Sequence, residues 1–463
     1  MGVLSTIFLT STAVFIIVIS LAIHHIGKPQ SVPVLEEVYW GPGSPPAKQR
    51  TDVSPMKVTF TEEMIKDLKN RLANTRYTPP LEGIAQEYGF NTDLLKEIVD
   101  FWQTKYNFKE RETYLNKYPH FTTNIQGLDI HFMHIKPKDT KGLTVLPLLI
   151  LHGWPGSFRE FYNLIPLLTT RNPNHNFVFE VIAPSLPGFG YSQAPAKPGC
   201  GALEMSVIMK NLMLRLGHTQ FYLQGGDWGS IVAANLATLF REHVLGIHCN
   251  MCFVSTPLSW LKRIAGTLYP PAIVDEKYQE RYYPMSAWFK NMMLESGYFH
   301  LQATKPDTVG VGLNDSPAGL AAYILEKFTT GTNAAFKARK DGGLKEYFTY
   351  DDLLDNVMIY WVTNSMTSGM RIYAESFTNI QRVPIVVPSA CANFRNELFY
   401  TPEGVLKDRY VNLVQNTHYE DGGHFIAMQM PKKLSEDFFG AVAKMEEQHQ
   451  LKQASAKQSS NEL

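Results

Sequence analysis

The chain has no excess of charge of either sign, because its 43 Lys and Arg residues balance 43 Asp and Glu residues. It also has no long basic run or stripe. Proteins that bind nucleic acid carry such a basic footprint, so we expect no nucleic-acid partner. The apolar share of 44% and the aromatic share of 12% suit a globular enzyme with an apolar pocket.

Cysteine is also scarce, with four residues in a chain of 463. This number is too small for a disulfide framework, and we expect the thiols to stay reduced in the cytoplasm. Cys249 and Cys252 form a C-x-x-C inside the apolar run from Ile247 to Val254, without a second pair or a nearby His-x-His. We therefore interpret them as small apolar residues of a buried strand.

Charged side chains are absent from Val3 to Ile23. A helix of roughly 20 apolar residues spans a bilayer, so we expect a transmembrane anchor. A cleaved signal peptide is the alternative, but it would have a basic beginning and a shorter apolar stretch. No Lys or Arg precedes the segment, whereas Lys28, Lys48 and Arg50 follow it, which places the rest of the chain in the cytoplasm.

From about Leu128 onward, short apolar runs alternate with Gly/Pro turns and helical stretches. This texture predicts an α/β fold with a mostly parallel sheet and helices on both faces. The expected strands are 145–151, 177–183, 221–224 and 385–387. Turns rich in glycine or proline follow the first three strands, and they should line one crevice at the carboxyl ends of the strands.

The turn Gly225-Gly226-Asp227-Trp228-Gly229 stands between a predicted strand and a predicted helix, Ser230 to Phe240. Its form is that of a nucleophile elbow, with Asp at the place where Ser is usual. A carboxylate attacks a carbon that carries a leaving group, such as an epoxide oxygen or a halide, and becomes an ester itself. The alternative for Asp227 is an ordinary helix N-cap.

A second turn follows the predicted strand 145–151 and has the sequence His152-Gly153-Trp154-Pro155-Gly156. It sits where the first oxyanion-hole loop should, one strand earlier than the elbow. Backbone N–H groups of Trp154 and Trp228 are predicted to face the oxyanion that forms when water attacks an Asp227 ester. The alternative is a Gly/Pro turn with a stacked Trp. His152 is a poor candidate base, since its place in this turn indicates a structural hydrogen bond.

A base must activate water beside the ester, and His has the pKa for that work. His424 follows Gly422-Gly423 near the end of the core, in the chain order nucleophile, acid, histidine. A carboxylate should hold its imidazole, and Glu397 after the 385–387 strand is the first choice. Glu403, Glu420 and Asp421 are the competitors.

These observations divide the chain as an α/β-hydrolase with additions. We expect an anchor at 1–25, a linker and helical N-terminal region at 26–120, and a first part of the core at 121–255. A helical lid at 256–375, a second part of the core at 376–447 and a disordered tail at 448–463 follow. Within the N-terminal region, helices are expected after the N-cap Thr61 and over Thr92 to Trp102.

Opening an epoxide also needs an acid near the leaving oxygen, and Tyr remains protonated at pH 7. The chain holds 22 tyrosines, so composition does not select the acid.

Several segments together resemble the microsomal epoxide hydrolases and, more narrowly, the insect juvenile hormone epoxide hydrolases. The resemblance covers the chain from the anchor to about Pro431. It rests on these motifs: Tyr77-Thr78-Pro79-Pro80-Leu81, Tyr118-Pro119-His120-Phe121, Gly127 to Phe132, His152 to Ser157, Gly226 to Ser230, Glu295-Ser296-Gly297-Tyr298, Thr304 to Thr308 and Gly422-Gly423-His424-Phe425.

The resemblance implies Asp227 as nucleophile, His424 as base, Glu397 as its orienting acid, and Tyr298 with Tyr373 as the lid pair at the epoxide oxygen. It further implies a helical N-terminal arm over the core, an endoplasmic-reticulum membrane location, and no metal or organic cofactor. The expected function is hydrolysis of an apolar epoxide, juvenile hormone or its acid, to the diol.

Four other functions stay open from the residues. They are a broad detoxifying epoxide hydrolase, an ester hydrolase, a haloalkane dehalogenase and a non-catalytic hormone-binding protein. An Asp elbow cannot usefully accept an acyl group, which disfavours the ester hydrolase. A tyrosine pair suits an oxygen better than a halide, which disfavours the dehalogenase.

Overall fold

The computed structural model describes residues 28, 30–376 and 380–461. The predicted anchor, Val3 to Ile23, lies outside these residues. Within the described part of the chain, no helix combines the length and the apolar character that crossing a membrane requires.

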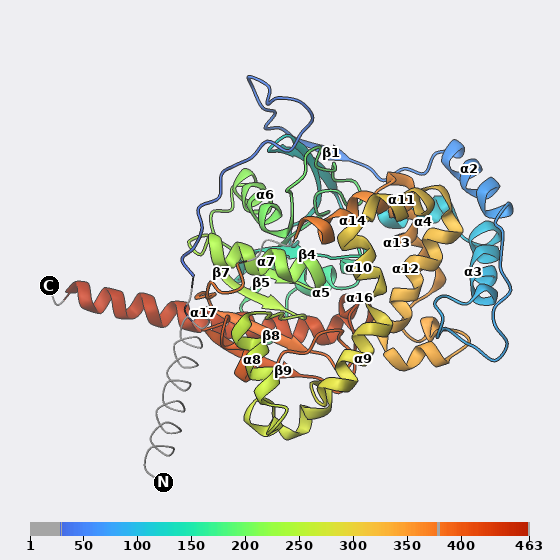
Figure 1. Ribbon diagram of the computed structural model, residues 1–463. Helices are drawn as coiled ribbons and strands as arrows, with labels where there is room; N and C mark the ends of the chain where they lie inside the picture. The colour runs from blue at the N-terminus through green and yellow to red at the C-terminus, as the bar shows by residue number, and fades with distance from the viewer. Residues whose placement is uncertain (1–27, 29, 377–379, 462–463) are drawn as a thin grey trace, which may run out of the picture.

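Nine strands of the described chain form one sheet in the order β1-β2-β3-β5-β4-β6-β7-β8-β9 (Figure 1). The strands from β5 to β9 in this order are parallel to their neighbours, whereas β1, β2 and β3 pair antiparallel at one edge and β3 joins β5 antiparallel. The predicted α/β-hydrolase fold with a mostly parallel sheet is confirmed. The strands are β1 (Val53–Met56), β2 (His120–Ile125), β3 (Leu128–Ile135), β4 (Thr144–Leu151), β5 (Phe177–Pro184), β6 (Phe221–Gly225), β7 (Val244–Cys249), β8 (Ser389–Asn393) and β9 (Leu413–His418).

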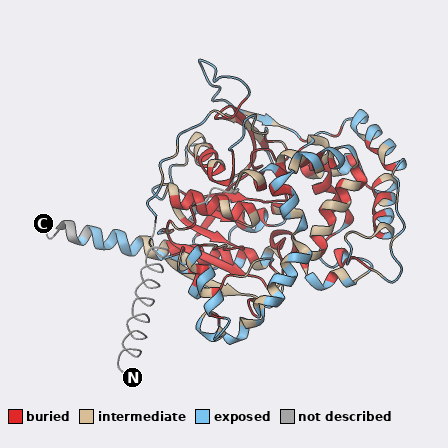
Figure 2. Cartoon of the chain, in the orientation of Figure 1, coloured by how far each residue is buried: buried red, intermediate tan, exposed pale blue. Residues whose placement is uncertain are grey.

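The core helices pack on the sheet in two pairs, α6 with α7 and α5 with α17. Their bounds are α5 (Ile165–Thr169), α6 (Ala202–Arg215), α7 (Asp227–Leu239), α15 (Glu403–Leu406), α16 (Ile426–Gln429) and α17 (Pro431–Asn461), and the short 3-10 helix η1 is Phe158–Phe161. Figure 2 shows the parallel strands and the sheet-facing sides of these helices buried, as a sheet covered on both faces requires.

The lid inserted between β7 and β8 is helical (Figure 1). It comprises α8 (Pro257–Ala265), η2 (Pro270–Ala272), η3 (Glu276–Arg281), α9 (Met285–Glu295), α10 (Gly297–Thr304), α11 (Pro306–Asp315), α12 (Pro317–Thr332), η4 (Ala334–Ala338), η5 (Leu344–Glu346), α13 (Tyr350–Thr363) and α14 (Met366–Glu375).

The N-terminal helices α2 (Glu62–Ala73), α3 (Thr92–Thr104) and α4 (Phe108–Leu115) pack against the lid helices α12 and α13. Both predicted N-terminal helices are present, and Thr61 caps α2 by accepting a 3.2 Å hydrogen bond from the amide of Met64. The same region also contributes β1 to the sheet edge, which the sequence reading missed. The N-terminal region is therefore shared between core and lid.

Two element predictions near the C-terminus were wrong. The segment Ile385 to Val387 forms only an isolated bridge from Ile385 to Tyr410, and the strand β8 starts at Ser389. Pro388 precedes that strand, and proline lacks the amide that a ladder needs. The predicted disordered tail from 448 is instead the end of α17, which continues to Asn461, and residues 450–456 of this helix are exposed (Figure 2). The segment contains Lys, Gln and Ala, which favour helix.

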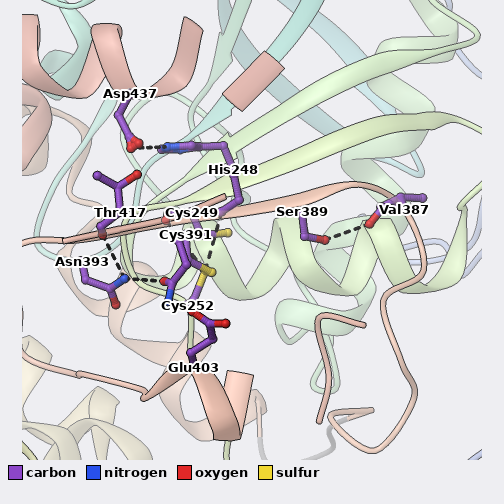
Figure 3. Close-up of a disulfide and its surroundings, with 12 residues drawn as sticks. His248, Cys249, Cys252, Val387, Ser389, Cys391, Asn393, Glu403, Thr417 and Asp437 are labelled. Carbon is purple, nitrogen blue, oxygen red and sulfur yellow. Dashed lines mark hydrogen bonds and ion pairs between the residues drawn. A yellow bond between two sulfur atoms is a disulfide. The ribbon is translucent and has the colours of Figure 1, made fainter. Parts of the chain in front are cut away.

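The expectation of reduced, isolated cysteines was also wrong for one pair. Cys252 and Cys391 form a disulfide close to the free thiol of Cys249 (Figure 3). Cys200 is also a free thiol. Cys391 lies in β8 beside Cys249 of the neighbouring strand β7, and the chain turns after β7 so that Cys252 meets Cys391. The two partners are 139 residues apart in sequence, so the local C-x-x-C pattern could not reveal the bond.

A buried ion pair joins the lid, the core and the N-terminal helices. Asp355 of α13 accepts hydrogen bonds from Arg159 Nε, Arg111 Nε and Tyr106 Oη at 2.9, 2.9 and 3.0 Å. The Asp355 carboxylate is fully buried, and the Arg159 side chain is 1% exposed. Charges buried this deeply depend on their partners, because neither can recover its hydration.

We expect Asp355→Asn to lower the free energy of unfolding by about 3–5 kcal/mol, since it removes the buried carboxylate that Arg159 and Arg111 share and leaves Asp352 as the remaining carboxylate beside Arg159. Urea unfolding of the full chain measures this effect. Asp315→Asn is the matched control, because the Asp315 side chain is 79% exposed and its bond to Arg71 lies at the surface. The control should change stability by about 0–1 kcal/mol, and equal losses in the two variants would contradict the assigned role of the buried pair.

Candidate active site

The elbow after β6 holds Asp227 in a strained backbone conformation, with φ at +48°. Side chains other than glycine rarely adopt this region, so the surrounding packing must impose it. A Cβ at Gly229 would stand 2.1 Å from the carbonyl oxygen of Leu151, and one at Gly226 would stand 2.7 Å from Asn250 Nδ2. The glycines around Asp227 are therefore required by close packing at the first turn of α7.

One oxygen of the Asp227 carboxylate faces the second glycine-rich turn. The amide of Trp154 donates a 2.8 Å hydrogen bond to Asp227 Oδ1. Gly153 permits this approach, because a Cβ there would lie 2.1 Å from the same oxygen. In the described chain the amide of Trp228 makes no hydrogen bond to this carboxylate, so its place in the oxyanion hole stays a prediction.

The other oxygen faces His424. His424 Nε2 lies 3.3 Å from Asp227 Oδ2, and its Nδ1 lies 2.7 Å from Oε1 of Glu397. Side-chain exposures of 5% for His424 and 2% for Glu397 put this pair inside the protein. The structure thus brings the predicted nucleophile, base and orienting acid into one row.

The competing carboxylates lie away from the imidazole and pair with lysines. Glu403 pairs with Lys407, Glu420 with Lys277 and Asp421 with Lys433. All six of these side chains are at least one third exposed.

The row of charges controls the protonation of His424. Burial alone lowers the pKa of this histidine, but the charges and hydrogen bonds of Glu397 and Asp227 outweigh burial and raise its pKa well above the ordinary value. In the resting site the two carboxylates therefore favour the imidazolium form of His424. Removal of one of the two negative charges favours the neutral ring, which is the form that can act as a base.

His152 has a structural place, as expected. Its Nε2 accepts a hydrogen bond from the amide of Leu186 at 3.1 Å, and its Nδ1 lies 3.0 Å from the carbonyl oxygen of Gly153. Complete burial lowers the pKa of His152 to about 4. The neutral ring joins the Trp154 turn to the turn after β5.

Two lid tyrosines face the nucleophile from α10 and α14. The Tyr298 ring stacks on Trp154 at 5.4 Å between centroids, and the Tyr373 ring meets Trp228 edge-on at 4.8 Å. Their own centroids are 6.2 Å apart. Burial, followed by neighbouring groups that include Asp227, raises the pKa of both phenols, so both remain hydrogen-bond donors at neutral pH.

Glu160 is a further titratable group at this site, and the sequence reading missed it. It lines a small cavity together with Asp227, His424, Gln224 and Asn250. Burial raises the pKa of Glu160 to about 8; the charge of His424 opposes the shift and that of Asp227 adds to it. Its carboxyl fills the space beside Gly156, where a Cβ would stand 1.4 Å from Oε1. The signal in the sequence is an acid four residues after this glycine.

A larger cavity opens between the lid and the core. It has a volume of about 610 Å³, and Tyr298 and Glu397 lie in its wall. Most of the wall is aromatic or aliphatic, including Phe253, Trp288 and Phe299. Such a cavity suits a long apolar molecule, one end of which would lie against Tyr298.

Comparisons with known proteins agree with this geometry. Residues 53–161 match a family model described as the epoxide hydrolase N terminus, and residues 147–273 match one described as the alpha/beta hydrolase fold. The chain is 53% identical to juvenile hormone epoxide hydrolase 2 of Ctenocephalides felis over 90% of each chain. It is 44% identical to epoxide hydrolase 1 of Sus scrofa over 90% of this chain and 94% of that one.

A solved structure gives the same picture. The crystal structure of juvenile hormone epoxide hydrolase from Bombyx mori superposes with a TM-score of 0.88 at 46% identity. The match covers 90% of this chain and all of that chain.

The charge state of His424 gives a direct test of the row of charges. Its raised pKa means that the imidazolium persists to a higher pH than that of an ordinary histidine. In Asp227→Asn one of the two carboxylates is lost, so the titration midpoint of His424 should move to lower pH. NMR of histidine-labelled protein across the pH range measures both midpoints. Identical midpoints in the two proteins would contradict the coupling between Asp227 and His424.

Proposed function

Because this chain belongs to the epoxide hydrolase family, we propose that it converts an apolar epoxide, juvenile hormone or its acid, to the diol through an ester on Asp227. It is a hydrolase that acts on epoxides, and the proposal concerns its substrate and its chemical route. The observation that carries the route is the position of Asp227, with Oδ1 on the Trp154 amide and Oδ2 beside His424 Nε2.

Ring opening uses the carboxylate oxygen of Asp227 that faces His424 and does not accept from the Trp154 amide. Asp227 Oδ2 attacks one epoxide carbon, the carbon–oxygen bond of the ring breaks, and the carboxylate becomes an ester. Tyr298 and Tyr373 donate hydrogen bonds to the leaving oxygen, and one of them gives it a proton as the ring opens, which leaves a tyrosinate. Their high pKa values support this role, because they keep both protons in place until the oxygen develops negative charge.

Hydrolysis then depends on the charge that ring opening removed. The ester is neutral, so His424 loses the attraction of one carboxylate, its pKa falls, and its proton passes to the tyrosinate that ring opening leaves. The neutral ring takes a proton from water, which attacks the Asp227 carbonyl carbon, and Glu397 stabilises the imidazolium that forms. The oxyanion develops on Oδ1, where the Trp154 amide already donates, and collapse releases the diol and restores the carboxylate.

The substrate proposal rests on the large cavity and on the relatives. A largely apolar wall that includes Tyr298 suits a long terpenoid chain better than a small polar epoxide. Relatives from insects carry juvenile hormone in their names, while the relative from Sus scrofa is named only as an epoxide hydrolase.

Trapping the ester tests the route and the substrate together. His424→Gln removes the base, and we expect hydrolysis to slow by about 10²–10⁴-fold while ring opening continues. After incubation with juvenile hormone, intact-mass spectrometry should show the protein heavier by one hormone molecule, attached to the peptide that contains Asp227.

His300→Gln is the matched control, because His300 is exposed on α10 and should leave turnover unchanged without an adduct. Asp227→Asn should give neither adduct nor diol. Diol production by His424→Gln at the wild-type rate would refute the proposed base. Faster turnover of small aryl epoxides than of juvenile hormone would favour the broad detoxifying role.

We also propose that Val3 to Ile23 anchors the enzyme in the endoplasmic-reticulum membrane with the catalytic domain in the cytoplasm. The uncharged run and the basic residues after it support this arrangement. The Cys252–Cys391 disulfide stands against the cytoplasmic side, since such bonds are rare in the cytosol.

Fractionation of expressing cells decides the anchor and its orientation. The full chain should stay in carbonate-washed membranes, and a variant without residues 3–23 should move to the supernatant. Protease added to sealed microsomes should digest the catalytic domain. Protection of that domain would reverse the proposed orientation, and release of the full chain by carbonate would exclude the anchor.

A further inference from the structure

The lid places one arginine in the wall of the large cavity without a polar partner. Arg263 lies on α8 and is 8% exposed. Its Nε and Nη2 atoms are buried and have no hydrogen-bond partner among the described residues, and none of the described carboxylates forms an ion pair with it. A buried charge without a counter-charge is costly, so an unpaired guanidinium in a cavity needs an explanation.

Aromatic rings hold the guanidinium in place. Its central carbon lies 3.9 Å from the ring centroid of Trp288 and 4.1 Å from that of Tyr282. Cation–π contacts of this kind offset part of the lost hydration. They leave unused the N–H donors, which point outward in the plane of the guanidinium group. Tyr283 Oη donates a 2.9 Å hydrogen bond to the Arg263 carbonyl oxygen and fixes the backbone that carries the side chain.

The other charges of this wall are already engaged. Arg395 forms an ion pair with Glu280, Arg281 donates a 2.7 Å hydrogen bond to the carbonyl oxygen of Phe394, and Glu397 holds His424. Among the described arginines of this wall, Arg263 is thus the one whose side chain has neither a hydrogen-bond partner nor an ion pair. Burial lowers the pKa of Arg263, yet a guanidinium remains charged at neutral pH.

We propose that Arg263 binds the carboxyl end of the substrate, as a free carboxylate or as the carbonyl oxygen of an ester, while the epoxide lies at Asp227. Tyr298 and Arg263 belong to the wall of the same cavity, so a chain with an epoxide and a carboxyl group can meet both. The planar fork of arginine suits a carboxylate best, because it can donate two parallel hydrogen bonds. The assignment deepens the proposed function and depends on it.

Arg263→Met tests the assignment, since methionine keeps the apolar contact with Trp288 and removes the donors. Three epoxides of equal chain length are compared, one ending in a carboxylate, one in a methyl ester and one in a methyl group. We expect kcat/KM to fall about 10- to 100-fold for the acid and about fivefold for the ester. For the hydrocarbon it should stay within about twofold.

Arg339→Met is the matched control, because Arg339 is a lid arginine paired at the surface with Asp341 and Glu346. It removes the same charge and should leave all three substrates unaffected. Equal losses on the acid and the hydrocarbon in Arg263→Met would assign a purely structural role to the stack. An unchanged value for the acid would also overturn the proposal.

Two further measurements test the role of Arg263 even if Arg263→Met does not fold or if the proposed reaction is wrong. If Arg263→Met does not fold, Arg263→Lys decides, with a loss for the acid alone in support and an equal loss for the hydrocarbon against. Calorimetric titration with dodecanoate and with dodecanol needs no turnover. Preference of the wild type for dodecanoate, lost in the variant, supports the site even if juvenile hormone is not a substrate, and equal binding of both ligands refutes it.

Discussion

The imidazole of His424, held between two carboxylates, is the interaction on which the rest of the site depends. Glu397 fixes one side of the ring and Asp227 occupies the other, and together they raise the pKa of the histidine well above its ordinary value. The resting site therefore favours the protonated ring, which cannot act as a base. In the proposed route, the first step consumes the charge of Asp227 and so prepares His424 as the base of the second step. The electrostatics of the site would then set the order of the two steps.

This arrangement depends on the positions of three turns, which carry Asp227, Trp154 and His424. Helix α13 holds the Trp154 turn through two hydrogen bonds of 2.7 Å. Asn356 donates to the carbonyl oxygen of Pro155, and Tyr360 donates to that of Gly156. The neighbouring Asp355 ties the same helix to Arg159 next to that turn. The lid thus both covers the large cavity and supports the turn that carries the Trp154 amide.

Local sequence features predicted the parts of the site that depend on local geometry. Asp227 stands in a glycine pattern that a tight strand-to-helix turn requires, and His424 follows two glycines in the expected chain order. Spacing in the sequence could not distinguish Glu397 from Glu403 as the partner of His424. The distinction arises because β8 and β9 are neighbouring strands, and the loops that follow them bring Glu397 and His424 together.

Contacts between distant segments were beyond such reasoning. Tyr298 and Tyr373 came from the resemblance alone, since nothing in their neighbours marks them among the other tyrosines. The Cys252–Cys391 bond forms because the whole lid is inserted between two strands that are neighbours in the sheet. The strand predicted at 385–387 begins instead at Ser389, after a single proline. A single turnover in water labelled with heavy oxygen tests the central claim most directly. The label should enter the Asp227 carboxylate and leave the first diol unlabelled; label carried wholly by that diol would contradict the covalent ester.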